Sequence, residues 1–298
     1  MIRHLLDIAD FTADELRLIL DLAQRPDLPD VLAGKGAALI FEKPSNRTRH
    51  SMEMAVFQLG GHPVYTRGDE VGFDTRESVE DITRVMAGYH GLLAARVFSH
   101  AVVARMAAVS RVPVVNMLSE HSHPLQALAD ALTMQQVHGS VAGLAVAYVG
   151  AYNNVARSLA EACALLGATL ALGCARGYHA DDAELERLNA LGLGTVTQVH
   201  RAIDAVAGAT AVHTDTWTPM GQEAEKQHRA QAFEGFMVDA TMMAAAAAGA
   251  SFYHCLPAYR GLEVAAEVID GPHSQVIAQA HNRLPAARGA LAFILGVR

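Results

Sequence analysis

The chain has 298 residues, of which 51% are hydrophobic and 18% are charged, so it is long enough for one large or two medium domains and too apolar for a disordered protein. Its formal net charge of −8, with histidines neutral, argues against a nucleic-acid-binding protein, because phosphate backbones attract surfaces rich in Lys and Arg. No window of about 18 residues is uniformly apolar, so the sequence predicts no membrane span.

The amino-terminal half alternates between helical and strand-like patterns. Thr12 to Glu15 form a capping box, and apolar residues follow at helical spacing. The further elements expected here are a strand at 37–41, a helix ending at Gly60 and Gly61, a strand near 64–65, a helix at 78–89, a strand at 92–97, a helix at 101–109, a strand at 112–116 and a helix at 123–137.

The same alternation continues in the second half of the chain. The expected elements are a strand at 144–149, helix at 154–166, strand at 169–173, helix at 181–191, strands at 195–199 and 211–214, helix at 222–233, strand at 236–238, an alanine-rich helix to Ala248 and a strand at 251–254. The last segment, 274–297, is expected to be helical with a kink or break at Pro285, because proline lacks a backbone N–H.

Strands that alternate with helices in this way predict parallel sheets covered by helices on both faces. We therefore expect an α/β fold of two doubly wound parallel-sheet domains with an interdomain cleft. The first domain comprises residues 1–130 and is completed by a carboxyl-terminal helix at 275–298, and the second comprises 131–274. One helix within 125–140 is expected to connect them.

The cysteines indicate the compartment. Cys163, Cys174 and Cys255 lack the short paired spacing of a zinc site, and free thiols are typical of a reducing cytoplasm. The amino terminus shows no signal-peptide pattern. The sequence therefore predicts a cytoplasmic protein.

A phosphate-binding pattern follows the first strand. Ser45-Asn46-Arg47-Thr48-Arg49 lies where a strand gives way to a helix, and the backbone N–H groups at a helix start favour an anion. The hydroxyls of Ser45 and Thr48 and the planar guanidinium of Arg47 add donors suited to phosphate. Ordinary helix capping in solvent explains this stretch equally well when it is taken alone.

Arg96, His123 and Gln126 extend this pattern. Arg96 ends an apolar strand, where a buried arginine needs an anionic partner, although a surface arginine is the alternative. His123 and Gln126 are three residues apart on one helical turn and suit a polarised carbonyl with its amino group, although a structural histidine is the alternative. Arg283 adds a positive charge from the last helix.

The second domain has its own polar residues at strand ends. His254-Cys255-Leu256-Pro257 ends a strand, and we interpret Cys255 as an amine contact or a buried apolar residue rather than a nucleophile, because no cysteine-protease context accompanies it. Asp215 follows another strand and suits an amino group, with a helix cap as the alternative.

The turn after the strand at 144–149 excludes one class of cofactor. Gly150 follows that strand as in a dinucleotide-binding fingerprint, but Tyr152 replaces the second glycine of the fingerprint. A nicotinamide cofactor is therefore not expected. Asn153 and Asn154, at the following helix start, suit a carboxylate instead.

Together these stretches resemble those of the aspartate/ornithine carbamoyltransferase family. Ser-x-Arg-Thr-Arg, His-Pro-x-Gln and His-Cys-Leu-Pro occur in the family's order and approximate spacing, and the resemblance extends over nearly the whole chain, from Ile2 to Val297. Asp-x-Trp followed by Met-Gly, and the Asn-Asn pair, are similar to the ornithine branch rather than the aspartate branch.

The resemblance implies an enzyme of arginine metabolism and amino-acid biosynthesis. It would transfer the carbamoyl group of carbamoyl phosphate to the δ-amine of L-ornithine, giving L-citrulline and phosphate without a metal or cofactor. Residues 1–130 would bind carbamoyl phosphate and residues 131–274 would bind ornithine. The family also implies a homotrimer or a multiple of trimers, and we expect no nucleic-acid or membrane partner.

By the same resemblance, individual residues receive roles. Carbamoyl phosphate would be bound by Ser45, Asn46, Arg47, Thr48, Arg96, His123, Gln126, Cys255, Leu256 and Arg283. Ornithine would contact Asn154, Asp215, Pro219 and Met220. Arg96, His123, Thr48 and Cys255 would act in catalysis.

Two positions depart from the family pattern. Pro219 stands where the ornithine branch has a serine, so a hydroxyl contact is lost, and Asn46 replaces a serine or threonine whose donor its amide supplies. Pro219 leaves open a carbamoyltransferase for another amine, such as an N-acylated ornithine or putrescine. A non-catalytic carbamoyl phosphate-binding paralogue is the remaining alternative.

Overall fold

The computed structural model describes residues 2–218 and 225–298. The chain divides into two compact units. The first unit consists of Met1–Leu132 and His281–Arg298, and the second unit of Thr133–Ala280. Each is an α/β unit built on a parallel sheet, as the alternating pattern predicts.

The first unit has a four-stranded parallel sheet within the described residues, in the order β2-β1-β3-β4. The strands are β1 (Gly36–Phe41), β2 (His62–Arg67), β3 (His90–Arg96) and β4 (Val114–Leu118). The chain runs from β1 to β2 on one side and then returns to β3 on the other. The strand order therefore changes direction between β1 and β3, and ligands of parallel α/β sheets bind beyond the carboxyl ends of the strands at such a point.

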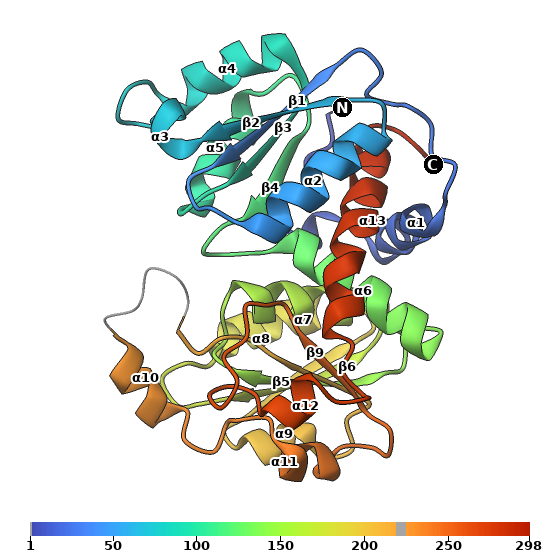
Figure 1. Ribbon diagram of the computed structural model, residues 1–298, viewed down its shortest axis with the longest axis vertical. Coiled ribbons are helices and arrows are strands. Elements are labelled where there is room, and N and C mark those ends of the chain that lie inside the picture. Colours follow the sequence, from blue (N-terminus) through green and yellow to red (C-terminus); the bar gives the residue numbers. More distant parts are fainter. Residues whose placement is uncertain (1, 219–224) are drawn as a thin grey trace. The chain divides into compact units, whose positions relative to one another are not determined.

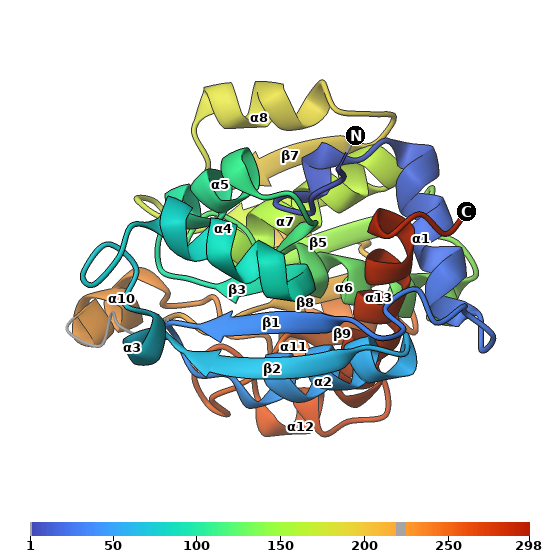
Figure 2. The same cartoon turned by 90° about the horizontal axis from the view of Figure 1, so that it is seen from above.

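Helices cover both faces of this sheet. They are α1 (Ala13–Gln24), α2 (Asn46–Gln58), α3 (Gly68–Val71), α4 (Val79–Tyr89), α5 (His100–Val109), the first part of α6 (Pro124–His138) and most of α13 (Val276–Ile294), with a 3₁₀ turn η1 at Ile8–Asp10. Figures 1 and 2 show α4 and α5 on one face and α2 on the other. The face beneath α4 and α5 buries Ile40, Leu93 and Ala95 against Ile82 and Met106, and each such large side chain contributes about 1.5–3 kcal/mol by leaving water.

The second unit has a five-stranded parallel sheet in the described part of the chain, in the order β7-β6-β5-β8-β9. The strands are β5 (Ala145–Gly150), β6 (Thr169–Cys174), β7 (Thr195–Val199), β8 (Ala211–Thr214) and β9 (Ser251–His254). Here the strand order changes direction between β5 and β8. The carboxyl ends of these two strands therefore mark the expected ligand position in this unit.

The helices of the second unit also lie on both faces. They are α7 (Asn154–Leu166), α8 (Asp182–Asn189), α9 (Ala202–Val206), α10 (Lys226–Ala232), α11 (Ala240–Ala245) and α12 (Ala266–Ile269), with the last part of α6 and the first part of α13. Figure 1 shows α7 and α8 above the sheet and α9, α11 and α12 below it. The lower face packs Val149, Val212 and Phe252 against Val206 and Met242.

Most predicted elements are present, and two predictions are wrong. Residues 236–238 form no strand; Val238 makes one isolated bridge to Val264, and the apolar run is explained by burial of Phe236 and Val238 in the core. The alanine-rich helix ends at Ala245 rather than Ala248. Of the kink or break predicted at Pro285, the break does not occur: α13 is continuous through this residue, and packing of the carboxyl-terminal half of the helix outweighs the loss of one hydrogen bond.

The boundary between the units falls inside two helices, α6 and α13.

Among the described residues, no helix is both long and apolar enough to span a bilayer.

His213 makes the stability of the second unit dependent on pH. It lies in β8 with 3% of its surface exposed, and its ring stacks on Tyr253 at 4.5 Å between centroids. Burial, followed by the charge of His254, lowers the pKa of His213 to about 3. From about pH 6.5 down to about pH 3 the unfolded chain therefore binds a proton that the native state excludes, and stability falls as pH falls.

We expect His213→Leu to unfold with a shallower dependence on pH than the wild type between pH 6 and pH 4. The slopes of the unfolding free energy against pH should differ between the wild type and His213→Leu by up to about 1.4 kcal/mol per pH unit, which is the value for one proton. Denaturant unfolding at several pH values measures it. His228→Leu, at an exposed position, is the matched control and should keep the wild-type slope; equal slopes for all three proteins would contradict the expectation.

Candidate functional site

The amino terminus of α2 follows β1 and presents hydrogen-bond donors. Ser45 caps the helix, with its Oγ accepting from Thr48 N at 3.4 Å and donating to Thr48 Oγ1 at 3.1 Å. Asn46 and Arg47 are the first two residues of the helix, where backbone N–H groups have no carbonyl partner within the helix. This end of α2 therefore favours an anion.

A buried arginine from α13 organises the polar side chains behind this helix start. Arg283 Nη1 donates to Gln126 Oε1 at 2.7 Å, and its Nη2 donates to Thr48 Oγ1 at 3.2 Å. Gln126 Nε2 in turn donates to Asp130 Oδ1 at 2.7 Å. At most 3% of each of these four side chains is exposed. Because a buried charge is costly unless it is hydrogen-bonded, this network holds the hydroxyl of Thr48 and the guanidinium of Arg283 in place.

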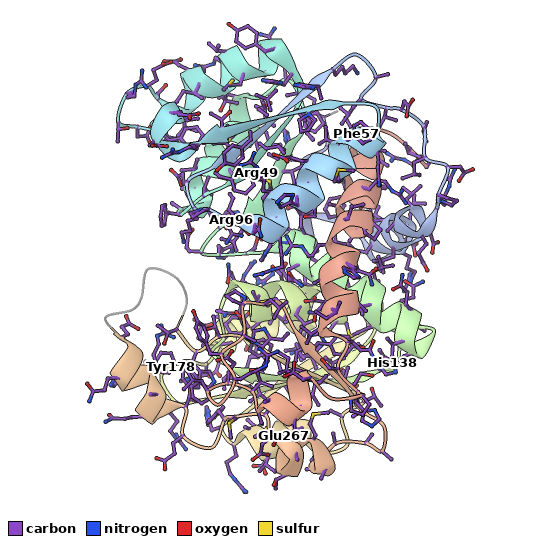
Figure 3. The ribbon with its side chains drawn as sticks, viewed as in Figure 1. Arg49, Phe57, Arg96, His138, Tyr178 and Glu267 are labelled. Carbon is purple, nitrogen blue, oxygen red and sulfur yellow. The ribbon has the colours of Figure 1, made fainter. Side chains whose placement is uncertain are left out.

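Arg96 and His123 complete what we call the cationic cluster (Arg47, Thr48, Arg96, His123, Gln126 and Arg283). Arg96 is the last residue of β3 and pairs in register with Phe41 at the end of β1; Figure 3 labels it at this end of the strand. His123 directly precedes α6. Both are buried, with 6% and 5% of their surfaces exposed.

The charge state of His123 follows from its surroundings. Burial, followed by the positive charges of Arg283, Arg96 and Arg47, lowers the pKa of His123 well below its ordinary value. The ring is therefore neutral near pH 7. A neutral imidazole can donate one N–H to a carbonyl oxygen and accept at the other nitrogen.

The turn before His123 is fixed by Asn116. Its Nδ2 donates to Leu6 O at 3.0 Å and to Ser122 Oγ at 3.0 Å, and Ser122 N donates to Ser119 Oγ at 3.2 Å. Asn116 and Ser122 are fully buried. His123 is therefore presented by a rigid turn rather than by a loose loop.

Lys43 adds to the positive field, although its position was not singled out in the sequence. Its Nζ lies 4.2 Å from the centroid of the Phe98 ring, and burial, followed by the charge of Arg96, lowers its pKa. In the sequence, the feature that could have identified Lys43 is its position two residues before Ser45.

The second unit gathers a different set at the carboxyl ends of β5, β8 and β9. Asp215 follows β8 and is 7% exposed. Its Oδ1 accepts from Cys255 Sγ at 3.1 Å and from Thr216 N at 2.7 Å, and its Oδ2 accepts from Asn153 Nδ2 at 2.8 Å. We call Asn153, Asp215 and Cys255 the Asp215 cluster. It presents a carboxylate and a thiol, which suit a cationic amino group.

The segment after β9 is held from behind by His254 and Glu263. His254 Nδ1 accepts from Leu256 N at 2.9 Å, and His254 Nε2 lies 3.2 Å from Glu263 Oε1. Leu256 has φ of 57°, and the Leu256–Pro257 peptide bond is cis. These contacts fix the backbone on either side of Cys255.

Asp215, His254 and Cys255 also offer one ligand atom each within 4.8 Å of one another. A metal ion would have to displace hydrogen bonds already made there, since both His254 nitrogens and the Cys255 thiol have partners within this unit. The donor set is therefore better explained by hydrogen bonding than by metal coordination.

The structure thus distributes the predicted residues between the two units. Ser45, Asn46, Arg47, Thr48, Arg96, His123, Gln126 and Arg283 lie in the first unit, and Asn154, Asp215, Cys255 and Leu256 lie in the second. Pro219 and Met220 lie outside the described residues. Asp130 and the Asn153–Asp215 contact were not predicted. Asn153 was expected to suit a carboxylate of a ligand, and its amide donates instead to Asp215 of the protein, 62 residues away.

Comparisons with known proteins also divide the chain in two, although the second matched region includes residues 281–294, which the structure places in the first unit. The family model of the aspartate/ornithine carbamoyltransferase carbamoyl-P binding domain matches residues 3–136, and that of the Asp/Orn binding domain matches residues 142–294. An ornithine carbamoyltransferase from Thermus thermophilus is 43% identical over 297 residues, which cover 98% of this chain and 97% of that protein.

Solved structures of carbamoyltransferases are also similar to this chain over nearly its whole length. Ornithine carbamoyltransferase from Pyrococcus furiosus superimposes with a TM-score of 0.94 at 39% identity, covering 99% of this chain and 98% of that one. A structure of N-acetyl-L-ornithine transcarbamylase has a TM-score of 0.88 at 30% identity, covering 98% of this chain and 100% of that one.

Proposed function

The chain belongs to the aspartate/ornithine carbamoyltransferase family, and from this premise we propose that it transfers the carbamoyl group of carbamoyl phosphate to the δ-amine of L-ornithine, giving L-citrulline and phosphate. The observation that supports this most directly is the cationic cluster. All its residues lie in the first unit, and all except Arg283 lie in the region matched by the carbamoyl-P binding domain, whereas the Asp215 cluster lies in the region matched by the Asp/Orn binding domain.

Carbamoyl phosphate is assigned to the cationic cluster because the phosphate and the carbonyl oxygen of this acyl phosphate each have matching donors. The amino terminus of α2, with Ser45, Asn46 and Arg47, suits the phosphate. Arg96, His123 and Thr48 suit the carbonyl oxygen. Gln126 and Arg283 orient Thr48, and we retain Cys255 and Leu256 as proposed contacts on the basis of the family resemblance.

Ornithine is assigned to the second unit. The carboxylate of Asp215 suits an ammonium group, and the amide of Asn154, the first residue of α7, suits the substrate carboxylate. Pro219 and Met220 are retained as proposed contacts on the basis of the family resemblance.

The chemistry is an acyl transfer. The uncharged δ-amine attacks the carbamoyl carbon, a C–N bond forms, and the C–O bond to phosphate breaks. Negative charge that builds on the carbonyl oxygen is stabilised by Arg96, Thr48 and the neutral His123, since preorganised donors in a buried site stabilise such charge strongly. Cys255 and Asp215 steer the amine, and the departing phosphate, which leaves with the electron pair of the broken bond, accepts the amine proton.

The acceptor amine is tested by a substrate panel. With carbamoyl phosphate, we expect citrulline from ornithine as the main product, and turnover of putrescine, N-acetylornithine and aspartate each at least about tenfold slower, because a site built to pair a charged group rejects substrates that lack it. Product formation is measured for each amine at equal concentration.

The outcomes separate the alternatives. Preference for N-acetylornithine or putrescine would keep the carbamoyl chemistry and reject ornithine, and it would identify Pro219 as the marker of changed specificity. Tight binding of carbamoyl phosphate with no turnover of any amine would support a non-catalytic paralogue.

The wider setting is proposed from the resemblance and the surface. We propose a cytoplasmic enzyme of arginine metabolism; fractionation of the source cells measures the compartment. We also propose a homotrimer or a multiple of trimers, supported by apolar side chains exposed on the first unit at Phe57 (64%) and Tyr89 (73%), the former labelled in Figure 3. Light scattering measures the mass, and a monomer at working concentration would reject this proposal.

A further inference from the structure

Tyr152 lies in the turn that joins β5 to α7, directly before Asn153, and is anchored at two points. Its hydroxyl donates to Glu184 Oε1 at 2.7 Å, and its backbone N donates to Tyr178 O at 2.7 Å. The first contact connects the turn to α8, which lies beside α7 in the same unit (Figure 1).

Glu184 is itself held in a network of ion pairs. Arg187 Nε and Nη2 donate to its two oxygens at 2.6 and 2.7 Å, and Arg157 Nε lies 3.2 Å from Oε1. Both arginines also reach Glu161 Oε1, at 3.0 Å from Arg157 and 2.9 Å from Arg187. The Glu161 side chain is fully buried and that of Glu184 is 19% exposed. The buried helix α7 and the helix α8 thus share one network of ion pairs, which reaches the turn through Tyr152.

Near neutral pH, Tyr152 and Glu184 keep the charge states that this hydrogen bond needs. Burial acts to raise the pKa of Glu184, but hydrogen bonds from Arg187 and Tyr152 outweigh it and lower the pKa to about 2. Burial and the neighbouring Glu184 raise the pKa of Tyr152. The phenol therefore keeps its proton and the carboxylate keeps its charge, and a hydrogen bond to a charged acceptor is stronger than one between neutral groups.

Asn153, the next residue, connects the turn to Asp215. Its Oδ1 accepts from Val155 N and Ala156 N at 3.0 Å each, which caps α7, and from Tyr148 OH at 3.3 Å. Its Nδ2 donates to Asp215 Oδ2 at 2.8 Å. The orientation of the Asp215 carboxylate therefore depends on Asn153, and the place of Asn153 depends on the turn that Tyr152 anchors.

We infer that Tyr152 and Glu184 are a positioning pair for the acceptor amine. They touch no reacting atom; through Asn153 they set where Asp215 meets the ammonium group of the amino acid. This inference rests on the proposed function, because it assigns the Asp215 cluster to the amine that accepts the carbamoyl group.

The test compares Tyr152→Phe, Glu184→Gln and Tyr178→Phe with the wild type in steady-state kinetics and thermal melts. In Tyr152→Phe the hydrogen bond to Glu184 is lost while the ring remains. We expect the KM for ornithine to rise about tenfold. The kcat should stay within about twofold of the wild-type value, because the contact with the ammonium group that is weakened is made equally in the ground state and the transition state. The KM for carbamoyl phosphate should also stay within about twofold of the wild-type value.

The other two variants separate positioning from structure. Glu184→Gln keeps an amide oxygen to accept from Tyr152 but loses the charge that pairs with Arg157 and Arg187, so we expect a lower melting temperature with the KM for ornithine closer to that of the wild type. Tyr178→Phe is the matched control. Its hydroxyl makes no hydrogen bond to any described residue, and its backbone contact to Tyr152 is kept, so its kinetics should equal those of the wild type.

The wild-type assay distinguishes the two levels of the proposal. No carbamoylation of ornithine by the wild type would overturn the proposed function and the inference together. Turnover by the wild type with an unchanged KM for ornithine in Tyr152→Phe, or with an equal rise in Tyr178→Phe, would overturn the inference alone. A parallel rise in both substrate KM values would also overturn it, because general loosening of the fold would then explain the effect.

Discussion

Arg96→Ala is expected to lower kcat by about 10²–10³-fold, equivalent to about 2.7–4 kcal/mol of transition-state stabilisation. Arg96 is buried at the end of β3 and is close enough to His123 for its charge to lower the pKa of that ring. Its guanidinium is therefore desolvated, and by the proposed function it stabilises the carbonyl oxygen as that atom gains charge. Steady-state kinetics with saturating ornithine and carbamoyl phosphate measure the change.

Two further variants sharpen this test. Arg96→Lys keeps a positive charge but loses the planar fork of donors, so its kcat should fall between those of wild type and Arg96→Ala. Arg84→Ala, on the exposed face of α4 with 56% of its side chain accessible, is the matched control and should leave kcat unchanged. An unchanged kcat in Arg96→Ala would remove Arg96 from the site.

Asp215→Asn is expected to lower kcat/KM for ornithine by about 10²–10³-fold. The substitution keeps the size of the side chain but removes the negative charge, and it places an NH₂ group where one of three donors, from Cys255, Asn153 and Thr216, now points. Removing one partner of a desolvated charge pair costs about 2–5 kcal/mol. Initial rates over a range of ornithine concentrations measure the loss.

The loss in Asp215→Asn should be confined to the amine. Binding of carbamoyl phosphate, followed by calorimetry, should stay within about twofold of the wild-type Kd, because its proposed ligands lie mainly in the first unit. Asp204→Asn makes the same chemical change at a half-exposed position of the second unit and should leave kcat/KM for ornithine at the wild-type value. Equal kcat/KM for ornithine in wild type and Asp215→Asn would show that this carboxylate does not bind the amine.

Local patterns in the sequence were sufficient for most of the secondary structure. The capping box at Thr12 and Glu15 is present, with both reciprocal hydrogen bonds, and β7, β8, β9 and α7 have the predicted bounds. These elements could be predicted because hydrophobic periodicity and capping act within a few residues. Residues 236–238 were mistaken for a strand because burial in the core and burial in a sheet produce the same short apolar run.

The kinds of side chain available for the chemistry, and their places at strand and helix ends, can be read from the amino-acid sequence. Which of these side chains meet depends on the folded chain. Arg283 bonds to Gln126 across 157 residues of chain, and Asn153 to Asp215 across 62, and no local period encodes such pairs. The neutrality of His123 also needed the fold, because its pKa depends on burial and on arginines brought from three separate elements.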